Sequence, residues 1–382
     1  MTEASPRVRR RALARIWAIA ALPLLAILIA LIVGAVIILG SELIAGGPFN
    51  PILPLTAYLA LIQGAFGTFD AVVDTLVATS PLVFGGLAVA VAFRAGLFNI
   101  GAQGQFLMGA LGAVAAGVAV SGQPSIIAIP IAVAAGVAAG ALAGFIPGFL
   151  KATSGAHEVV TTIMLNYIAI QILALLVSGP LKVPNSPSPV TFEVGNASYP
   201  VLFGPNGHLG IVIAVVAVVV LSWVLYRTTL GFEIRAVGTN PDAAANAGMR
   251  PRGITVLSMT IAGALAGLAG TDVVLGSAHH MTSSFGTTVG FDSIAVALLA
   301  RSEPIGILPA ALLFGAMRAG ADLMQIKAQI PRELVDVIQA TILLVLVATP
   351  VLRRLINLRG TKAAIAPPPT ITRSYGSGEA QP

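Results

Sequence analysis

The sequence predicts an all-α integral membrane protein with about ten transmembrane or re-entrant helices and both termini in the cytoplasm. Of its 382 residues, 57% are hydrophobic and 9% are charged, whereas soluble domains carry about 25% charged residues. Apolar runs of the length that crosses a bilayer recur along the chain. The basic residues fall mainly in alternate connections between these runs, as the positive-inside rule requires.

The first apolar run, 17–39, follows five arginines and is about 23 residues long, which exceeds the apolar region of a signal peptide and suits a retained span. The later segments lie at 74–93, 100–120, 125–149, 159–178, 209–226, 253–275, 290–300, 305–323 and 334–352. Segment 290–300 is only about half a bilayer long. It is either a broken or re-entrant helix beside a cavity or a span that begins earlier with polar residues.

The charge distribution sets the predicted boundaries. Only three basic residues, Lys182, Lys327 and Arg332, fall on the outside, and seventeen fall on the inside. Residues 1–16 form a basic cytoplasmic tail, 17–352 the transmembrane domain, and 353–382 a basic, proline-rich tail that we expect to be disordered. The loop 227–252 is cytoplasmic. The loop 179–208 is extracytoplasmic and either contacts a partner there or is simply solvated.

Several kinds of chemistry are excluded by what the chain lacks. It has no cysteine, and none of its four lysines follows a glycine, so the phosphate-binding G-x-x-x-x-G-K-[ST] loop is absent. Its four histidines lack the spacing of a zinc site. We therefore predict no catalytic residue, no metal ligand and no enzyme activity. The basic residues lie in membrane loops, which argues against a nucleic-acid partner.

Two patterns predict how the helices pack. Glycines recur every four residues at 136, 140, 144 and 148, and again at 263 and 267, and such faces let helix backbones approach closely. The segment Leu87–Arg94 also resembles Ile294–Arg301. This similarity indicates a parallel internal repeat, unless it is chance in a chain rich in alanine and valine.

The loop 227–252 carries a helix signal. Asn240 is a suitable N-cap, Pro241 suits the first helical position, and Asp242 lies near the positive end of the helix dipole. Alanines continue the helix and Gly248 ends it. We predict a short helix on the cytoplasmic surface, whose small side chains would fit a groove on a partner.

Longer segments resemble a known family. They are GTNPDAAANAGM from residue 238, AFRAGLFNIGAQGQFLMGA at 92–110, HEVVTTIMLNYIA at 157–169 and GFDSIAVALLARSEPIGILPAALLFGA at 290–316. Together they resemble the permeases of nucleoside and simple-sugar importers of the ATP-binding-cassette superfamily, and FNIGAQGQ with TTIMLNY is similar to the nucleoside branch. The usual form of the first block has Glu where this chain has Gln103, so the chain carries no carboxylate at this position.

The resemblance implies an inner- or plasma-membrane subunit that translocates a nucleoside or a related sugar-containing solute. Its partners would be membrane lipid, a second permease that is a homologue or a copy of itself, a double-cassette ATPase that holds ATP and Mg²⁺, and a solute-binding lipoprotein or periplasmic protein. No cofactor is expected on this chain. The ATPase-coupling residues carried over are Gly238, Asn240, Pro241, Asp242, Ala243, Ala244 and Gly248.

Polar side chains inside apolar segments are candidates for the solute pathway. They are Asn99, Gln103, Gln105 and Asn166, whose amides could bind ribose hydroxyls and base edges or could instead join helices. Glu158 is expected either to cap its helix or to pair with Arg94. Arg318 and Asp322, at i,i+4 spacing, are expected to form an ion pair in preference to contacting the solute.

The main alternative is a secondary transporter driven by an ion gradient, which usually needs acidic residues at the membrane midplane. Here most acidic residues lie near the predicted span ends. A second alternative is a channel or scaffold without energy coupling. Neither accounts for a capped helix in the cytoplasmic loop.

Overall fold

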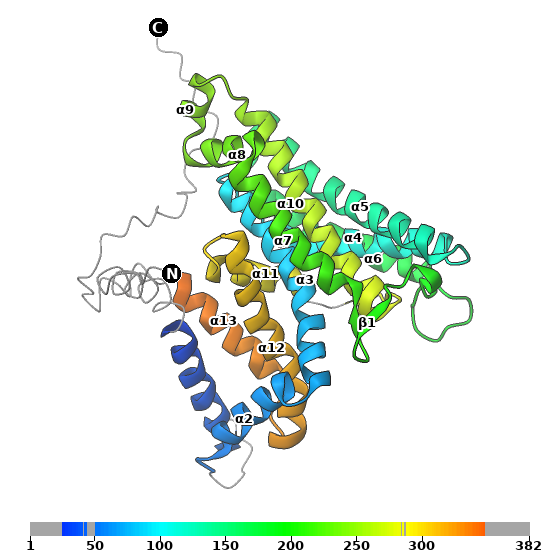
Figure 1. Cartoon of the computed structure of the whole chain (residues 1–382), viewed down its shortest axis with the longest axis vertical. Coiled ribbons are helices and arrows are strands. Elements are labelled where there is room, and N and C mark those ends of the chain that lie inside the picture. The colour runs from blue at the N-terminus through cyan, green and yellow to red at the C-terminus, as the bar shows by residue number, and fades with distance from the viewer. Residues whose placement is uncertain (1–24, 41, 44–49, 284, 286–287, 348–382) are drawn as a thin grey trace, which may run out of the picture. The chain divides into compact units, whose positions relative to one another are not determined.

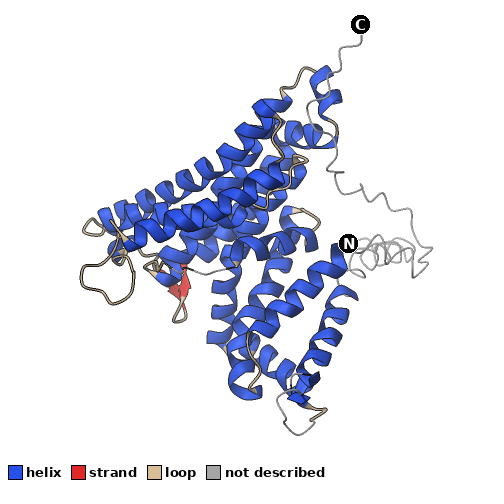
Figure 2. Ribbon diagram, turned by 180° about the vertical axis from the view of Figure 1, so that it is seen from behind, coloured by secondary structure: helices blue, strands red, loops and turns tan. Residues whose placement is uncertain are grey.

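The computed structural model describes residues 25–40, 42–43, 50–283, 285 and 288–347, and these are mostly helical (Figures 1 and 2). In these ranges seven helices are long and apolar enough to cross a membrane. They are α3 (Phe69–Arg94), α4 (Ala102–Ala119), α5 (Ser125–Ser154), α6 (Glu158–Ser178), α7 (Leu209–Arg227), α10 (Pro251–Val273) with a π-helical extension, Val274–Ala278, and α12 (Pro304–Ala328). The predicted all-α membrane fold is confirmed. The tails 1–16 and 353–382 lie outside the described residues.

Shorter helices complete the described chain. They are Leu25–Gly40, α2 (Leu53–Phe66), α8 (Thr229–Thr239), α9 (Pro241–Asn246), α11 (Val289–Leu299) and α13 (Glu333–Val347). Because α11 begins at Val289, it is a short helix of about 16 Å and not the end of a longer span. The sequence did not predict α2, whose 14 residues are too few for a window of span length.

The described residues form two compact units, one of those up to 64 together with 320–347, and one of those from 65 to 319. In the first unit the Tyr58 hydroxyl donates a hydrogen bond to the Leu31 carbonyl at 2.6 Å. Lys327 also donates to the Gln63 side chain at 2.7 Å. The second unit contains every candidate functional residue.

Glycine faces hold α5 and α10 together in the second unit. A Cβ atom added to Gly140 would lie 2.5 Å from the Gly263 carbonyl oxygen, and one added to Gly263 would lie 2.3 Å from that of Gly140. Gly144 and Gly267 face the other helix in the same way. The two backbones are therefore in direct contact, which confirms the predicted packing role of both glycine rows.

The two helices that carry the internal repeat, α3 and α11, pack side by side and run in the same direction. Gly85 faces Ser293 and Gly86 faces Val296. Further along both helices, Val89 packs with Ala297. This arrangement agrees with the parallel orientation that the repeat predicts.

The loop 179–208 is folded against the end of α10. It contains a turn of 3₁₀ helix, Gly195–Ala197, and a small antiparallel hairpin of β1 (Val201–Phe203) and β2 (Gly207–His208) (Figure 2). The Tyr199 N–H donates to the Leu275 carbonyl at 2.7 Å, and the Val194 N–H donates to the His279 carbonyl at 2.9 Å. The loop is thus an ordered cover on this end of the bundle.

Candidate functional site

The helix α9 forms where the sequence predicts it. The Asn240 side-chain oxygen accepts hydrogen bonds from the N–H groups of Asp242 and Ala243, both at 3.0 Å. At the other end, Gly248 has φ +85°, and the N–H of Met249 bonds to the Ala244 carbonyl at 3.1 Å. This is a Schellman termination, which favours glycine at the left-handed position.

The surface of α9 consists of small and polar side chains. Asp242, Ala243 and the following residues 245–248 are exposed, and nothing lies within 4 Å of a Cβ added to Gly248. Of the seven predicted coupling residues, Ala244 points inward, with 4% of its surface exposed, so it anchors the helix to the protein. Asn240, Asp242, Ala243 and Gly248 are exposed and can be approached by a partner groove, whereas Pro241 is half-buried and Gly238 lies in α8 against the backbone of Arg94.

The N-cap can be tested by Asn240→Ala. We expect this change to destabilise α9 by about 1 kcal/mol, because two N–H groups lose their acceptor. Hydrogen exchange of the α9 amides should therefore become about fivefold faster, while the amides of α10 keep their rates. Asn246→Ala, an exposed substitution at the last residue of the same helix, is the control, and equal exchange in both variants would contradict the capping role.

The preceding helix, α8, was missed by the sequence analysis. Its apolar residues Leu230, Ile234 and Val237 follow i, i+4, i+7 spacing, and the last two are buried. That amphipathic spacing was the signal that could have found it. The Thr228 hydroxyl caps the helix by accepting from the Gly231 N–H at 3.2 Å.

The four candidate pathway residues are brought together around the first turn of α4, and all four are buried. Asn99 and Gln105 form a reciprocal amide pair, with N···O distances of 2.8 and 3.1 Å. Asn166 of α6 accepts from the Gly104 N–H at 2.7 Å and donates to the Ile100 carbonyl at 3.0 Å. These contacts favour the helix-joining alternative, and solute binding by these amides stays a prediction.

The Gln103 side chain reaches α11. Its oxygen accepts a hydrogen bond of 2.9 Å from the Gly290 N–H, which is in the first turn of α11 and has no partner within that helix. A carboxylate in this position would also accept that bond and would favour the positive end of the helix dipole. The usual Glu and the Gln of this chain can therefore perform the same structural task.

Substitution of Gln103 tests this interpretation. Gln103→Glu should preserve thermal stability, whereas Gln103→Leu should lower it by about 1–3 kcal/mol, because the buried Gly290 N–H loses its acceptor. Thermal unfolding of the purified protein in detergent measures both. A Gln103→Leu protein that is as stable as Gln103→Glu would contradict the capping role.

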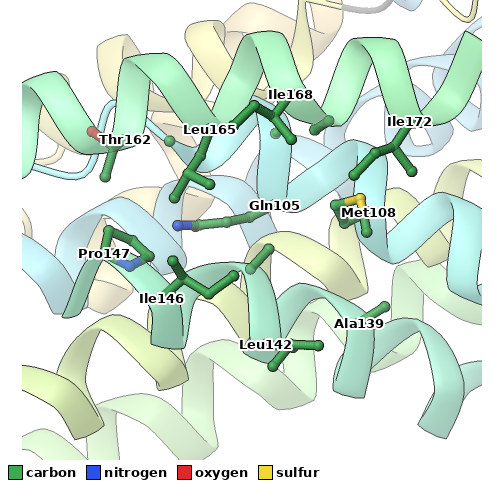
Figure 3. Close-up of a pocket in the computed structure, with 14 residues that line it drawn as sticks. Gln105, Met108, Ala139, Leu142, Ile146, Pro147, Thr162, Leu165, Ile168 and Ile172 are labelled. Carbon is green, nitrogen blue, oxygen red and sulfur yellow. The ribbon is translucent and has the colours of Figure 1, made fainter. Parts of the chain in front are cut away.

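A cavity of about 150 Å³ lies between α4, α5 and α6 (Figure 3). Most of its lining is aliphatic, as at Leu142, Ile146 and Ile168, and its polar side chains are Gln105 and Thr162. The Thr162 hydroxyl donates to the Glu158 carbonyl, and Gln105 bonds to Asn99. The cavity thus offers little to a solute rich in hydroxyl groups.

Both expected ion pairs were wrong in their partners. Glu158 pairs with Lys151 at 3.0 Å, because those residues flank the short turn between α5 and α6. Arg94 pairs with Glu303, and Arg318 lies 3.6 Å from Asp292. Within the residues that the structure describes, no three His, Asp or Glu side chains are grouped to hold a metal ion.

Comparison with known proteins places the chain in a family. Residues 71–347 match the family model described as branched-chain amino acid transport system / permease component. The chain belongs to this permease family. The permease is a multi-pass protein of the cell membrane, and its family is one of transport components.

Individual relatives cover most of the permease. A guanosine ABC transporter permease protein of Bacillus subtilis is 40% identical over 84% of this chain and 91% of its own length. A nucleoside ABC transporter permease protein of Lactococcus lactis is 36% identical over 84% and 88%. A glucose ABC transporter permease protein of Haloferax volcanii is 32% identical over 88% and 90%. No solved structure matches the chain.

Proposed function

We propose that this permease is the membrane subunit of an ATP-driven importer and that its solute is a nucleoside. The observation that carries the proposal is α9, a capped helix with an exposed surface of small side chains. An ion-driven transporter has no need for such a surface, whereas an importer must dock a separate ATPase. The nucleoside assignment is supported by the two relatives of 40% and 36% identity, which are named for guanosine and nucleosides.

The proposed assembly contains a second permease. Bacillus subtilis and Lactococcus lactis each have two matching chains, one at 36–40% identity and one at 22–28%. A heterodimeric core of this chain and a more distant homologue is therefore proposed in preference to two copies of this chain. A double-cassette ATPase would bind ATP and Mg²⁺, and an extracytoplasmic solute-binding protein would deliver the nucleoside.

In this proposal the end of the bundle with α8 and α9 faces the cytoplasm. ATP binding closes the two cassettes, and α9 follows the groove in which it is seated. Ala244 is buried, and the single residue Asn240 joins α9 to α8. A displacement of α9 therefore passes into the permease. The solute crosses between the two permeases.

Uptake of tritiated nucleosides by cells that express the whole operon tests the proposal. The double variant Asp242→Lys with Gly248→Trp places a reversed charge and a large side chain on α9. We expect loss of uptake and loss of ATPase copurification, with normal membrane insertion. The control is Asp70→Lys with Gly122→Trp, which makes the same residue changes at exposed sites in the first turn of α3 and just after the end of α4.

Uptake that survives ATP depletion and the α9 substitutions, but stops when the ion gradient is dissipated, would overturn the proposal in favour of a secondary transporter. ATP-dependent uptake of glucose without uptake of nucleosides would retain the importer and contradict the nucleoside assignment.

A further inference from the structure

A polar cluster joins the end of α3 to the turn between α11 and α12. Arg94 is the last residue of α3. Its Nη2 forms an ion pair with Glu303, and its Nε donates to the Ser302 carbonyl at 3.1 Å. One guanidinium group thus holds both the backbone and a side chain of the 301–303 turn, a geometry that lysine could not reproduce.

The same cluster extends to α7 and α8. The Tyr226 hydroxyl, near the end of α7, donates to the other carboxylate oxygen of Glu303. The Arg235 guanidinium of α8 lies 5.0 Å from the centre of the Tyr226 ring, and that of Arg94 lies 5.9 Å from it. Both distances are within the range of a cation–π contact. Glu303 therefore receives contacts from α3 and α7, and Tyr226 connects it to α8.

The backbone of α8 also lies directly against the end of α3. A Cβ atom added to Gly238 would be 2.1 Å from the Arg94 carbonyl oxygen. A Cβ atom added to Gly96, which has φ +74°, would lie 3.0 Å from the Gly238 carbonyl oxygen. Ile234 and Val237 bury the apolar face of α8. Since these contacts leave no free space, a displacement of α8 must move the Arg94–Gly96 turn.

The turn that receives these contacts has an unusual backbone. Arg301 and Ser302 have φ values of +54° and +56°, and two consecutive non-glycine residues in the left-handed region are uncommon. Such conformations persist only where neighbouring groups enforce them, and they are frequent in switch regions. Here Arg94 binds the Ser302 carbonyl and the Glu303 side chain, so it can stabilise this conformation.

We propose that Arg94 and Glu303 are a coupling pair that passes movement of α8 and α9 to α11. This inference rests on the proposed ATP-driven function and extends it. The turn 301–303 follows directly after α11, whose first turn is bonded to Gln103 of α4. A shift of the turn is therefore carried along a rigid helix to the buried amide cluster. Both residues position α11 and need not contact the solute.

The exposure of the pair makes the proposal testable. The Arg94 side chain is 25% exposed and that of Glu303 is 52% exposed. An ion pair with a half-exposed member contributes little to folding stability, so replacing Glu303 should leave the assembled complex intact. A transport defect in these variants would then report coupling rather than misfolding.

The experiment uses the full complex in proteoliposomes with its solute-binding protein and a panel of tritiated nucleosides. Arg94→Glu and Glu303→Arg are each expected to keep basal ATP hydrolysis and to lower nucleoside-stimulated hydrolysis and uptake about tenfold. The double variant that swaps the two charges should recover part of both activities, because it restores the ion pair but not the hydrogen bonds to the Ser302 carbonyl and from the Tyr226 hydroxyl. Arg332→Glu, which alters an exposed pair with Glu333, is the control and should transport normally.

Single variants that transport like the wild type would overturn the proposal, as would a swap that assembles but remains as defective as the single variants. If a charge reversal impairs assembly, Glu303→Gln, which keeps the shape of the side chain, is tested in its place. It should uncouple hydrolysis from uptake, and wild-type coupling in this variant would also overturn the proposal. Absence of ATP-dependent uptake in the wild-type complex would instead refute the proposed function itself.

Discussion

Replacing Gly140 with leucine is expected to remove most of the folded permease from the membrane. The Gly140 Cα hydrogen faces the backbone of α10, where even a Cβ atom would lie 2.5 Å from the Gly263 carbonyl. Backbone atoms cannot move aside as a flexible side chain can, so α5 and α10 must separate along their length. The loss of packing should exceed about 3 kcal/mol, the upper end of the usual cost of overpacking.

The matched control is Ala138→Leu, which lies two residues away on the exposed face of the same helix. It introduces the same side chain as Gly140→Leu into the same helix, but at a position where leucine meets no steric conflict. Fluorescence-detected size exclusion of the solubilised protein measures the folded fraction, and we expect a monodisperse peak for Ala138→Leu and its loss for Gly140→Leu. Equal peaks for the two variants would show that α5 and α10 are not in backbone contact.

The elements that sequence could predict were those with a local physical signature. A run of about twenty apolar residues is sufficient to identify a span, and α5, α6 and α7 begin and end close to the predicted residues. Glycines four residues apart mark a packing face whatever helix they meet. The capped helix α9 could also be predicted from the sequence, because Asn240, Pro241 and Asp242 act within one turn of each other.

The features that sequence could not predict depend on tertiary contacts. Arg94 was expected as a partner of Glu158, but it pairs with Glu303, which lies 209 residues away in the chain. The amides of Asn99 and Gln105 are the right chemical type for a solute site, and only the folded backbone shows that they bind each other. The helix α8 is a different case: it is too polar to form an apolar run, but the i, i+4, i+7 spacing of its apolar residues does predict an amphipathic helix.

A buried carboxylate near one end of the bundle provides the second large effect. Asp272 of α10 is 1% exposed and accepts a hydrogen bond from the Ser80 hydroxyl of α3. The His208 ring lies 3.8 Å from its other oxygen. Burial, together with nearby His279, lowers the pKa of His208 to about 4, so this imidazole is neutral at pH 7. Neither ring nitrogen of His208 has a hydrogen-bond partner among the described residues, so Ser80 is the side chain there that hydrogen-bonds Asp272.

Ser80→Ala should destabilise the permease by about 2–3 kcal/mol, because a buried acceptor of this kind loses its donor. Adding Asp272→Asn should recover part of that loss, since a neutral amide is less costly to leave unpaired than a carboxylate. In the presence of Ser80, the same Asp272→Asn change should give no gain. Thermal unfolding in detergent measures all four proteins of this double-mutant cycle.

The chain offers a matched control for this cycle in Ser258, which is also fully buried on α10 but whose hydroxyl has no hydrogen-bond partner among the described residues. Ser258→Ala removes the same atom without leaving a group unpaired, so its stability should be unchanged or slightly higher. A Ser80→Ala protein as stable as Ser258→Ala would mean that Asp272 does not depend on Ser80. If Ser80→Ala with Asp272→Asn is no more stable than Ser80→Ala alone, replacing the acid has no effect on stability. The loss of stability in Ser80→Ala would then come from lost packing between α3 and α10.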